Sequence, residues 1–148
     1  MDFSLARARR RRVASIVRIG RWKEDNLRTE FAELVRWAAH HHLRTGRWIF
    51  VDRGRHRWEA CLEIGGHPAS DGRIRLRTLP SEWVATVTFD PERISPRLVY
   101  HGLIDWTRAR RKDGTIRSVG AVREVYLGSP WTNRRAWAQC RVEFVVRR

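Results

Sequence analysis

A carboxylate near the end of the sequence has neighbours that could make it a binding group. In the segment 122–127, Glu124 and Tyr126 alternate with Arg123, Val125 and Leu127. Successive side chains of a strand point to opposite faces, so Glu124 and Tyr126 share one face. An ionised glutamate that faces inward requires a cationic ligand, an arginine partner or a proton. The alternative is a surface position at which Glu124 pairs with a neighbouring arginine.

The sequence also contains eight tryptophans, whose planar rings suit flat or cationic organic ligands. Four of them recur at matching positions of an internal repeat and are predicted to be structural: Trp37, Trp58, Trp106 and Trp137. The other four interrupt the repeat and lie near the ends of predicted elements: Trp22, Trp48, Trp83 and Trp131. Of these, we assign Trp22, Trp48 and Trp131 to a ligand site together with Glu124 and Tyr126.

Other reactive residue types do not form a recognisable site. The three histidines at 40–42 end a predicted helix, where consecutive side chains point about 100° apart and do not converge on one ion. Cys61 and Cys140 lie in apolar runs without metal-ligand spacing and are predicted to be buried free thiols. No phosphate-binding glycine loop or nucleophile motif occurs. We therefore predict no metal and no cofactor.

The elements that would position these residues come from a duplication. The residues at 13–17 are echoed at 84–88, those at 34–37 at 103–106, and those at 58–61 at 137–140. Three echoes in the same order indicate two copies of one unit. Each copy is predicted to contain a strand, a helix and two further strands. In the first helix Leu27, Phe31, Leu34 and Ala38 follow a helical period.

These units predict an α+β fold. Two tandem strand-helix-strand-strand repeats, at about 12–66 and 73–148, form one antiparallel sheet with two helices on one face, since each helix has a single apolar stripe to cover. The seam between the repeats is the natural place for a ligand groove. We predict one domain from residue 12 to residue 148, preceded by a basic segment at 1–11.

Charge raises a different possibility. The net charge is +15, and all but two of the 31 basic residues are arginine, which makes nucleic acid a partner to consider. Several arginines lie in the end segments, and most others are scattered singly, which is typical of solvated faces. No run of 18 or more apolar residues and no secretion signal is present, so we expect a cytoplasmic protein without a membrane span.

The motifs resemble a known family. The ending Arg123-Glu124-Val125-Tyr126-Leu127-Gly-Ser-Pro, the Leu-Pro at 79–80 and the segments 31–38 and 59–64 are similar to GyrI-like small-molecule-binding domains. That family comprises gyrase-inhibitory proteins and the effector domains of AraC-type and MerR-type regulators. The resemblance implies a ligand groove between the repeats, in which Glu124 engages a cationic drug. It also implies aromatic contacts from Tyr126 and Trp22.

Three functions follow from this resemblance. The leading one is a freestanding small-molecule-binding domain for an effector that is either a neutral aromatic compound or an aromatic cation. The first alternative is a hydrolase of strained electrophiles in which Glu124 is the general base. The second is a module that interacts with gyrase or nucleic acid through its basic surface, with a separately encoded protein as a further partner.

Overall fold

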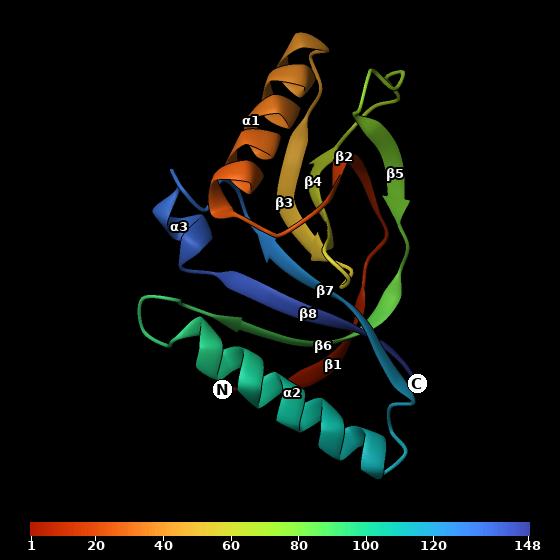
Figure 1. Ribbon diagram of the computed structural model, residues 1–148, viewed down its shortest axis with the longest axis vertical. Coiled ribbons are helices and arrows are strands. Elements are labelled where there is room, and N and C mark those ends of the chain that lie inside the picture. Colours follow the sequence, from red (N-terminus) through yellow and green to blue (C-terminus); the bar gives the residue numbers. More distant parts are fainter.

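The computed structural model describes residues 1–148 as an α+β fold built on one antiparallel sheet (Figure 1). The strands are β1 (Ser4–Ala8), β2 (Arg11–Ile19), β3 (Thr45–Asp52), β4 (Arg57–Ile64), β5 (Arg75–Leu79), β6 (Glu82–Phe89), β7 (Ser118–Tyr126) and β8 (Cys140–Arg147). The helices are α1 (Glu24–His40), α2 (Pro96–Lys112) and α3 (Arg134–Trp137). No helix has the length and apolar character needed to cross a membrane.

The sheet has the order β1-β6-β8-β7-β3-β4-β2-β5 and repeats one pattern in its two halves. Strands β2, β3 and β4 with α1 form the first unit, and β6, β7 and β8 with α2 form the second. Each unit places its last strand between its first and second ones, and the units meet where β3 pairs with β7. The predicted duplication and the single antiparallel sheet are confirmed.

Both long helices cover the same face of the sheet. Leu27, Phe31 and Leu34 of α1 are buried in a core with side chains of β2 and β4, whereas Val99 and Leu103 of α2 are buried with those of β6 and β8. The helical period in the sequence predicts these stripes, because residues three and four apart lie on one side of a helix. The two helices lie at opposite ends of the view, with α3 between them (Figure 1).

The central pair of the β3–β7 ladder consists of Phe50 and Glu124, with two pairs on either side. Because the two units are related about this ladder, the central partners occupy corresponding positions. The first unit therefore presents an aromatic ring where the second presents a carboxylate. Both side chains lie on the helix-covered face, next to Tyr126 in the alternation of β7.

The N-terminal segment is part of this sheet. Residues 1–11 are predicted to precede the domain as a separate basic segment, but in the structure β1 pairs with β6 of the second unit. In exchange β5, which precedes that unit, pairs with β2 of the first unit. Ser4 of β1 pairs with Thr86 of β6, and Arg11 of β2 pairs with Leu79 of β5. The β1–β6 and β2–β5 ladders therefore share one register, as in a single long hairpin. Strands β1–β2 and β5–β6 thus run side by side and close the curled sheet.

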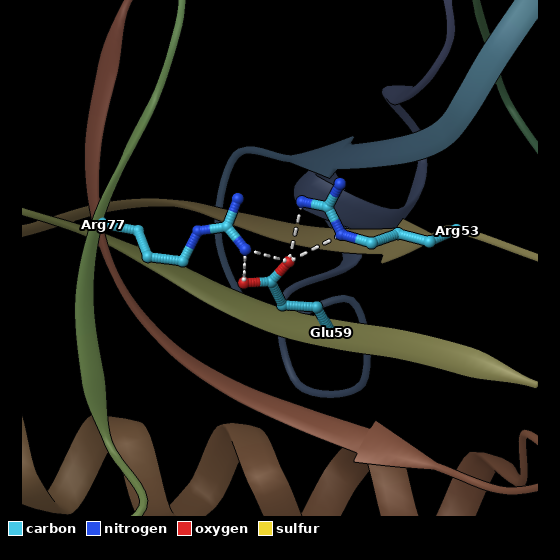
Figure 2. Close-up of polar contacts among 3 residues, drawn as sticks. All are labelled: Arg53, Glu59 and Arg77. Atoms are coloured by element: carbon cyan, nitrogen blue, oxygen red, sulfur yellow. Dashed lines mark hydrogen bonds and ion pairs between the residues drawn. The ribbon is translucent and has the colours of Figure 1, made fainter.

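The other face of the sheet encloses a smaller core with charged residues beside it. Val13, Ile49, Cys61 and Val125 are buried members of this core. Glu59 lies on the same face, two residues before Cys61, and is fully buried. Figure 2 shows its carboxylate between the guanidinium groups of two arginines, Arg53 and Arg77.

One echo in the sequence does not correspond to equivalent structure. The echo at 137–140 predicts Trp137 in a strand, but Trp137 ends helix α3 and β8 begins at Cys140. The reason is local: the Asn133 side chain accepts a hydrogen bond from the backbone N–H of Ala136 and so caps a short helix. Trp137 is therefore not the structural counterpart of the buried Trp58.

Candidate functional site

A pocket of about 400 Å³ lies over the β3–β7 seam on the helix-covered face. Its walls come from α1, from the segment between β6 and α2, and from the region around α3. Nine of its fourteen lining residues are hydrophobic, and the two charged ones are glutamates, Glu24 and Glu124. No arginine, lysine or histidine lines it, although the chain is strongly basic. The pocket is therefore both apolar and acidic.

Glu124 forms part of the pocket lining, and two phenols hold its carboxylate. The hydroxyl of Tyr100, on α2, donates to Oε1 at 2.6 Å, and the hydroxyl of Tyr126 donates to Oε2 at 3.0 Å. Because both donors are neutral, they fix the orientation of the carboxylate without cancelling its charge. Glu124 forms no ion pair with a protein side chain, so the predicted alternative of a surface arginine partner is wrong.

The wall behind Glu124 is formed by stacked and buried groups. The Trp137 ring is nearly parallel to Tyr126, with an interplanar angle of 11° and centroids 6.3 Å apart. Cys140 also lines the pocket, and burial, followed by the charge of Glu124, raises its thiol pKa to about 12. A thiol with this pKa is protonated at neutral pH and is a poor nucleophile. Cys140 is therefore an apolar wall residue.

Two of the predicted tryptophans lie at the mouth of the pocket. Trp22 is 51% exposed, and its ring centroid is 5.9 Å from that of Phe50. Trp131 packs 6.0 Å from Phe31 and donates from its indole nitrogen to Oε1 of Glu24 at 3.1 Å. Both rings line the pocket together with Glu124.

The third predicted tryptophan, Trp48, is placed differently. It lies on β3 and stacks on Phe31 with centroids 4.9 Å apart and an interplanar angle of 18°. It contacts the cores beneath both helices but does not line the pocket. Alternation puts Trp48 on the correct face of β3, and the bulky Phe31 of α1 separates it from the cavity.

Sequence reasoning missed several residues of the site, above all Tyr100. Its contact with Glu124 depends on how α2 crosses the sheet, which periodicity along one helix does not specify. Phe50 and Trp137 were missed as well, although both line the pocket. For Phe50 a usable signal was present, because the pairing of the two units at their seam places it beside Glu124.

The two tyrosines of the chain provide a titration test of this geometry. Burial, followed by the charge of Glu124, raises the pKa of Tyr100 and of Tyr126 far above the ordinary value of 10. The phenols ionise near pH 10 in the unfolded chain but only at higher pH in the folded protein. Their contribution to stability is therefore complete below pH 10 and is lost as the pH rises above 10. Above pH 10, each tyrosine should lower the free energy of unfolding by about 1.4 kcal/mol per pH unit.

We therefore expect no phenolate absorbance in the folded protein near pH 10, and its appearance only together with alkaline unfolding. The measurement is a pH titration that follows phenolate absorbance and circular dichroism on the same sample. Independent titration of one phenol near pH 10, before any loss of secondary structure, would contradict the buried hydrogen bonds to Glu124.

No family model matches the sequence, and no curated protein matches it. Several solved structures do. The C-terminal domain of EcmrR superposes with a TM-score of 0.70 and 16% identity, over 99% of this chain and 98% of that one. SAV2435, in a structure with tetraphenylphosphonium, gives a TM-score of 0.56 and 10% identity, with 99% and 94% covered. A hydrolase from Listeria innocua gives 0.56 and 8%, with 97% and 91% covered.

Fold and pocket together define a small α+β domain of two repeats with an acidic, aromatic pocket at their seam. At these identities the structural likeness concerns the fold. The chain has the GyrI-like fold, and its fold matches that of the C-terminal domain of EcmrR. The resemblance carried by the sequence motifs is confirmed at this level.

Proposed function

We propose that this domain reversibly binds a small, lipophilic, cationic aromatic compound in the pocket at the repeat seam. The observation that carries the proposal is the Glu124 carboxylate, held by two neutral phenols in an apolar cavity that no basic side chain lines. A carboxylate in such surroundings stabilises a cation strongly, because water screens the interaction poorly. Aromatic walls add dispersion and cation–π attraction.

The buried glutamates of the protein make the contrast clear. Glu30, Glu59 and Glu143 are each less than 4% exposed, and each contacts the guanidinium of at least one arginine. Arginines thus pair with the carboxylates that are buried elsewhere in the fold. The Glu124 carboxylate forms no ion pair in the protein and is available to a partner outside the chain. A protein of the same fold, SAV2435, has been seen with tetraphenylphosphonium, a lipophilic cation of this type.

The direct test compares two probes of the same shape and opposite charge. Tetraphenylphosphonium should quench tryptophan fluorescence saturably, because Trp22, Trp131 and Trp137 line the pocket. Tetraphenylborate, which has the same four phenyl rings around an anionic centre, should bind at least about 30-fold more weakly, since it meets Glu124 with a like charge.

Equal affinity for the two ions would show that apolar contact alone drives binding and would overturn the assignment of a cation site. A preference for the borate would do the same. The titrations require matched ionic strength, because the net charge of +15 favours anions in general.

Hydrolysis in the same pocket is the second candidate. It is favoured by the placement of a carboxylate beside two phenols, which could deprotonate a water molecule and return the proton. A protein of similar fold, named as a hydrolase from Listeria innocua, supports this candidate. Product analysis of an electrophilic aromatic ester or epoxide separates the two functions: turnover that Glu124→Gln abolishes indicates hydrolysis, and unchanged compound indicates binding.

A further inference from the structure

A second pocket, of about 360 Å³, lies on the opposite face of the sheet. It forms where the chain passes from β1 to β2, against the start of β3 and the paired strands β7 and β8. Five arginines from three separate regions of the chain line it: Arg7, Arg9, Arg11, Arg47 and Arg141. The one acidic residue in its lining is Glu143. Its electrostatic character is thus opposite to that of the Glu124 pocket.

Acidic residues near this second pocket compensate the arginines only in part. Glu63 accepts from Arg11 at 3.0 Å and from Arg9 at 3.4 Å. Burial raises the pKa of Glu63, but the backbone N–H of Arg47 and the Arg11 guanidinium outweigh that effect, and the net shift is downward. The carboxylate is therefore ionised at neutral pH, and it provides one negative charge for two guanidiniums.

Glu143 is shared in the same way. Its Oε1 lies 3.2 Å from Nε of Arg123 and its Oε2 lies 2.9 Å from Nε of Arg141. Glu59, which Figure 2 shows between Arg53 and Arg77, likewise provides one carboxylate for two arginines. Each carboxylate on this face thus leaves one positive charge without a counterion. Such an excess of positive charge favours the binding of an anion on this face.

Two arginines near the pocket retain free donors. Arg123 is 5% exposed, and its Nη2 is buried without a hydrogen-bond partner in the protein, which is unfavourable for a charged group. Arg123 is joined to the pocket through Glu143, which forms part of the lining. The half-buried Arg47 donates its backbone N–H to Glu63 at 3.1 Å, whereas its guanidinium takes part in no ion pair.

We propose that this arginine-lined pocket binds a small phosphate-bearing anion. A guanidinium presents parallel N–H donors that match two phosphate oxygens, and arginine keeps its charge at any physiological pH. A ligand with one carboxylate would need only one or two guanidinium groups. Five of them around one cavity suit a phosphate-bearing ligand, which has several charged oxygens. The site is separate from the Glu124 pocket, and the two take ligands of opposite charge.

The test uses inorganic pyrophosphate as the probe and isothermal titration calorimetry as the readout. The full chain should bind one equivalent. Arg47→Gln should weaken binding at least 10-fold, because it removes a guanidinium that no protein carboxylate neutralises. The matched control is Arg36→Gln on α1, which removes the same charge from an exposed position away from the pocket and should change the affinity less than twofold. Arg9→Gln, at a 65% exposed pocket position, is a second variant should Arg47→Gln fail to fold.

Three results would overturn the proposal: no binding of pyrophosphate, equal weakening by Arg47→Gln and Arg36→Gln, and binding of polynucleotides alone. The last two would indicate attraction by the overall charge of +15 instead of a built pocket. Tetraphenylphosphonium binding should be unchanged in Arg47→Gln, so failure at either pocket is measured independently of the other.

Discussion

Replacing Glu124 with glutamine should lower the affinity for tetraphenylphosphonium about 100-fold, which corresponds to about 2.7 kcal/mol. Glutamine has the size of glutamate and keeps an oxygen that can accept from Tyr100 or Tyr126, so what is removed is chiefly the charge. An effect of this size is expected for a carboxylate in direct contact with a cation at a partly desolvated site. The measurement is the tryptophan-fluorescence titration, repeated on the variant.

Two controls separate charge from structure. Glu24→Gln removes the other carboxylate of the pocket, which bonds to Trp131 at the mouth, and should weaken binding by less than about fivefold. The thermal midpoint of Glu124→Gln should remain close to that of the unmodified chain. If both glutamate variants lose affinity equally, the pocket attracts cations through general acidity and Glu124 has no special role.

Replacing Glu59 with glutamine should destabilise the fold by about 3 kcal/mol, a substantial part of the total for a domain of this size. The carboxylate is fully buried and accepts from Arg77 at 2.7 Å and from Arg53 at 3.0 Å (Figure 2). Without it, two guanidiniums repel one another beside an apolar core. We expect the lower end of the usual range for a broken buried pair, because both arginines are about one-third exposed and solvent screens them.

Urea unfolding followed by tryptophan fluorescence measures this effect. The matched control is Glu92→Gln, which breaks an exposed ion pair with Arg134 and should change the unfolding free energy by less than about 0.5 kcal/mol. Replacing Glu59 with leucine and both arginines with methionine should recover most of the loss, because apolar side chains of similar volume fill the same space. If the Glu59→Gln variant is as stable as the original protein, hydration of Arg53 and Arg77 replaces their ion pairs with Glu59, and the prediction is wrong.

The architecture was predictable because its signals are local. Apolar residues at helical spacing specify α1, alternation specifies β7, and the echoes along the chain specify the duplication. The segment at 1–11 was misread since its arginines hide a short strand: Leu5 and Ala8 turn toward the protein while Arg7 reaches Ser81. Its partner, β6, lies more than 70 residues away, and no local pattern records that pairing.

Part of the site was predictable. Alternation and motif together indicated Glu124 and Tyr126, the tryptophans that interrupt the repeat indicated Trp22 and Trp131, and all four line the pocket. Tyr100 and Trp137 could not be predicted, because they lie on α2 and α3 and their positions depend on how those helices pack against the sheet. No sequence pattern indicated which carboxylates receive distant arginines, since the pairs Arg77–Glu59 and Arg123–Glu143 join residues that only the sheet register brings together.

The Phe50–Glu124 pair at the centre of the β3–β7 ladder affects how a bound ligand would be oriented. Two identical half-chains associating about that ladder would be obliged to carry the same residue on both sides, either two rings or two mutually repelling acids. Because the two halves belong to one polypeptide, their sequences can differ at this position. The chain has Phe50 on one side of the ladder and Glu124 on the other. The two sides of the ladder therefore differ, and we expect a molecule charged at one end to place that end against Glu124.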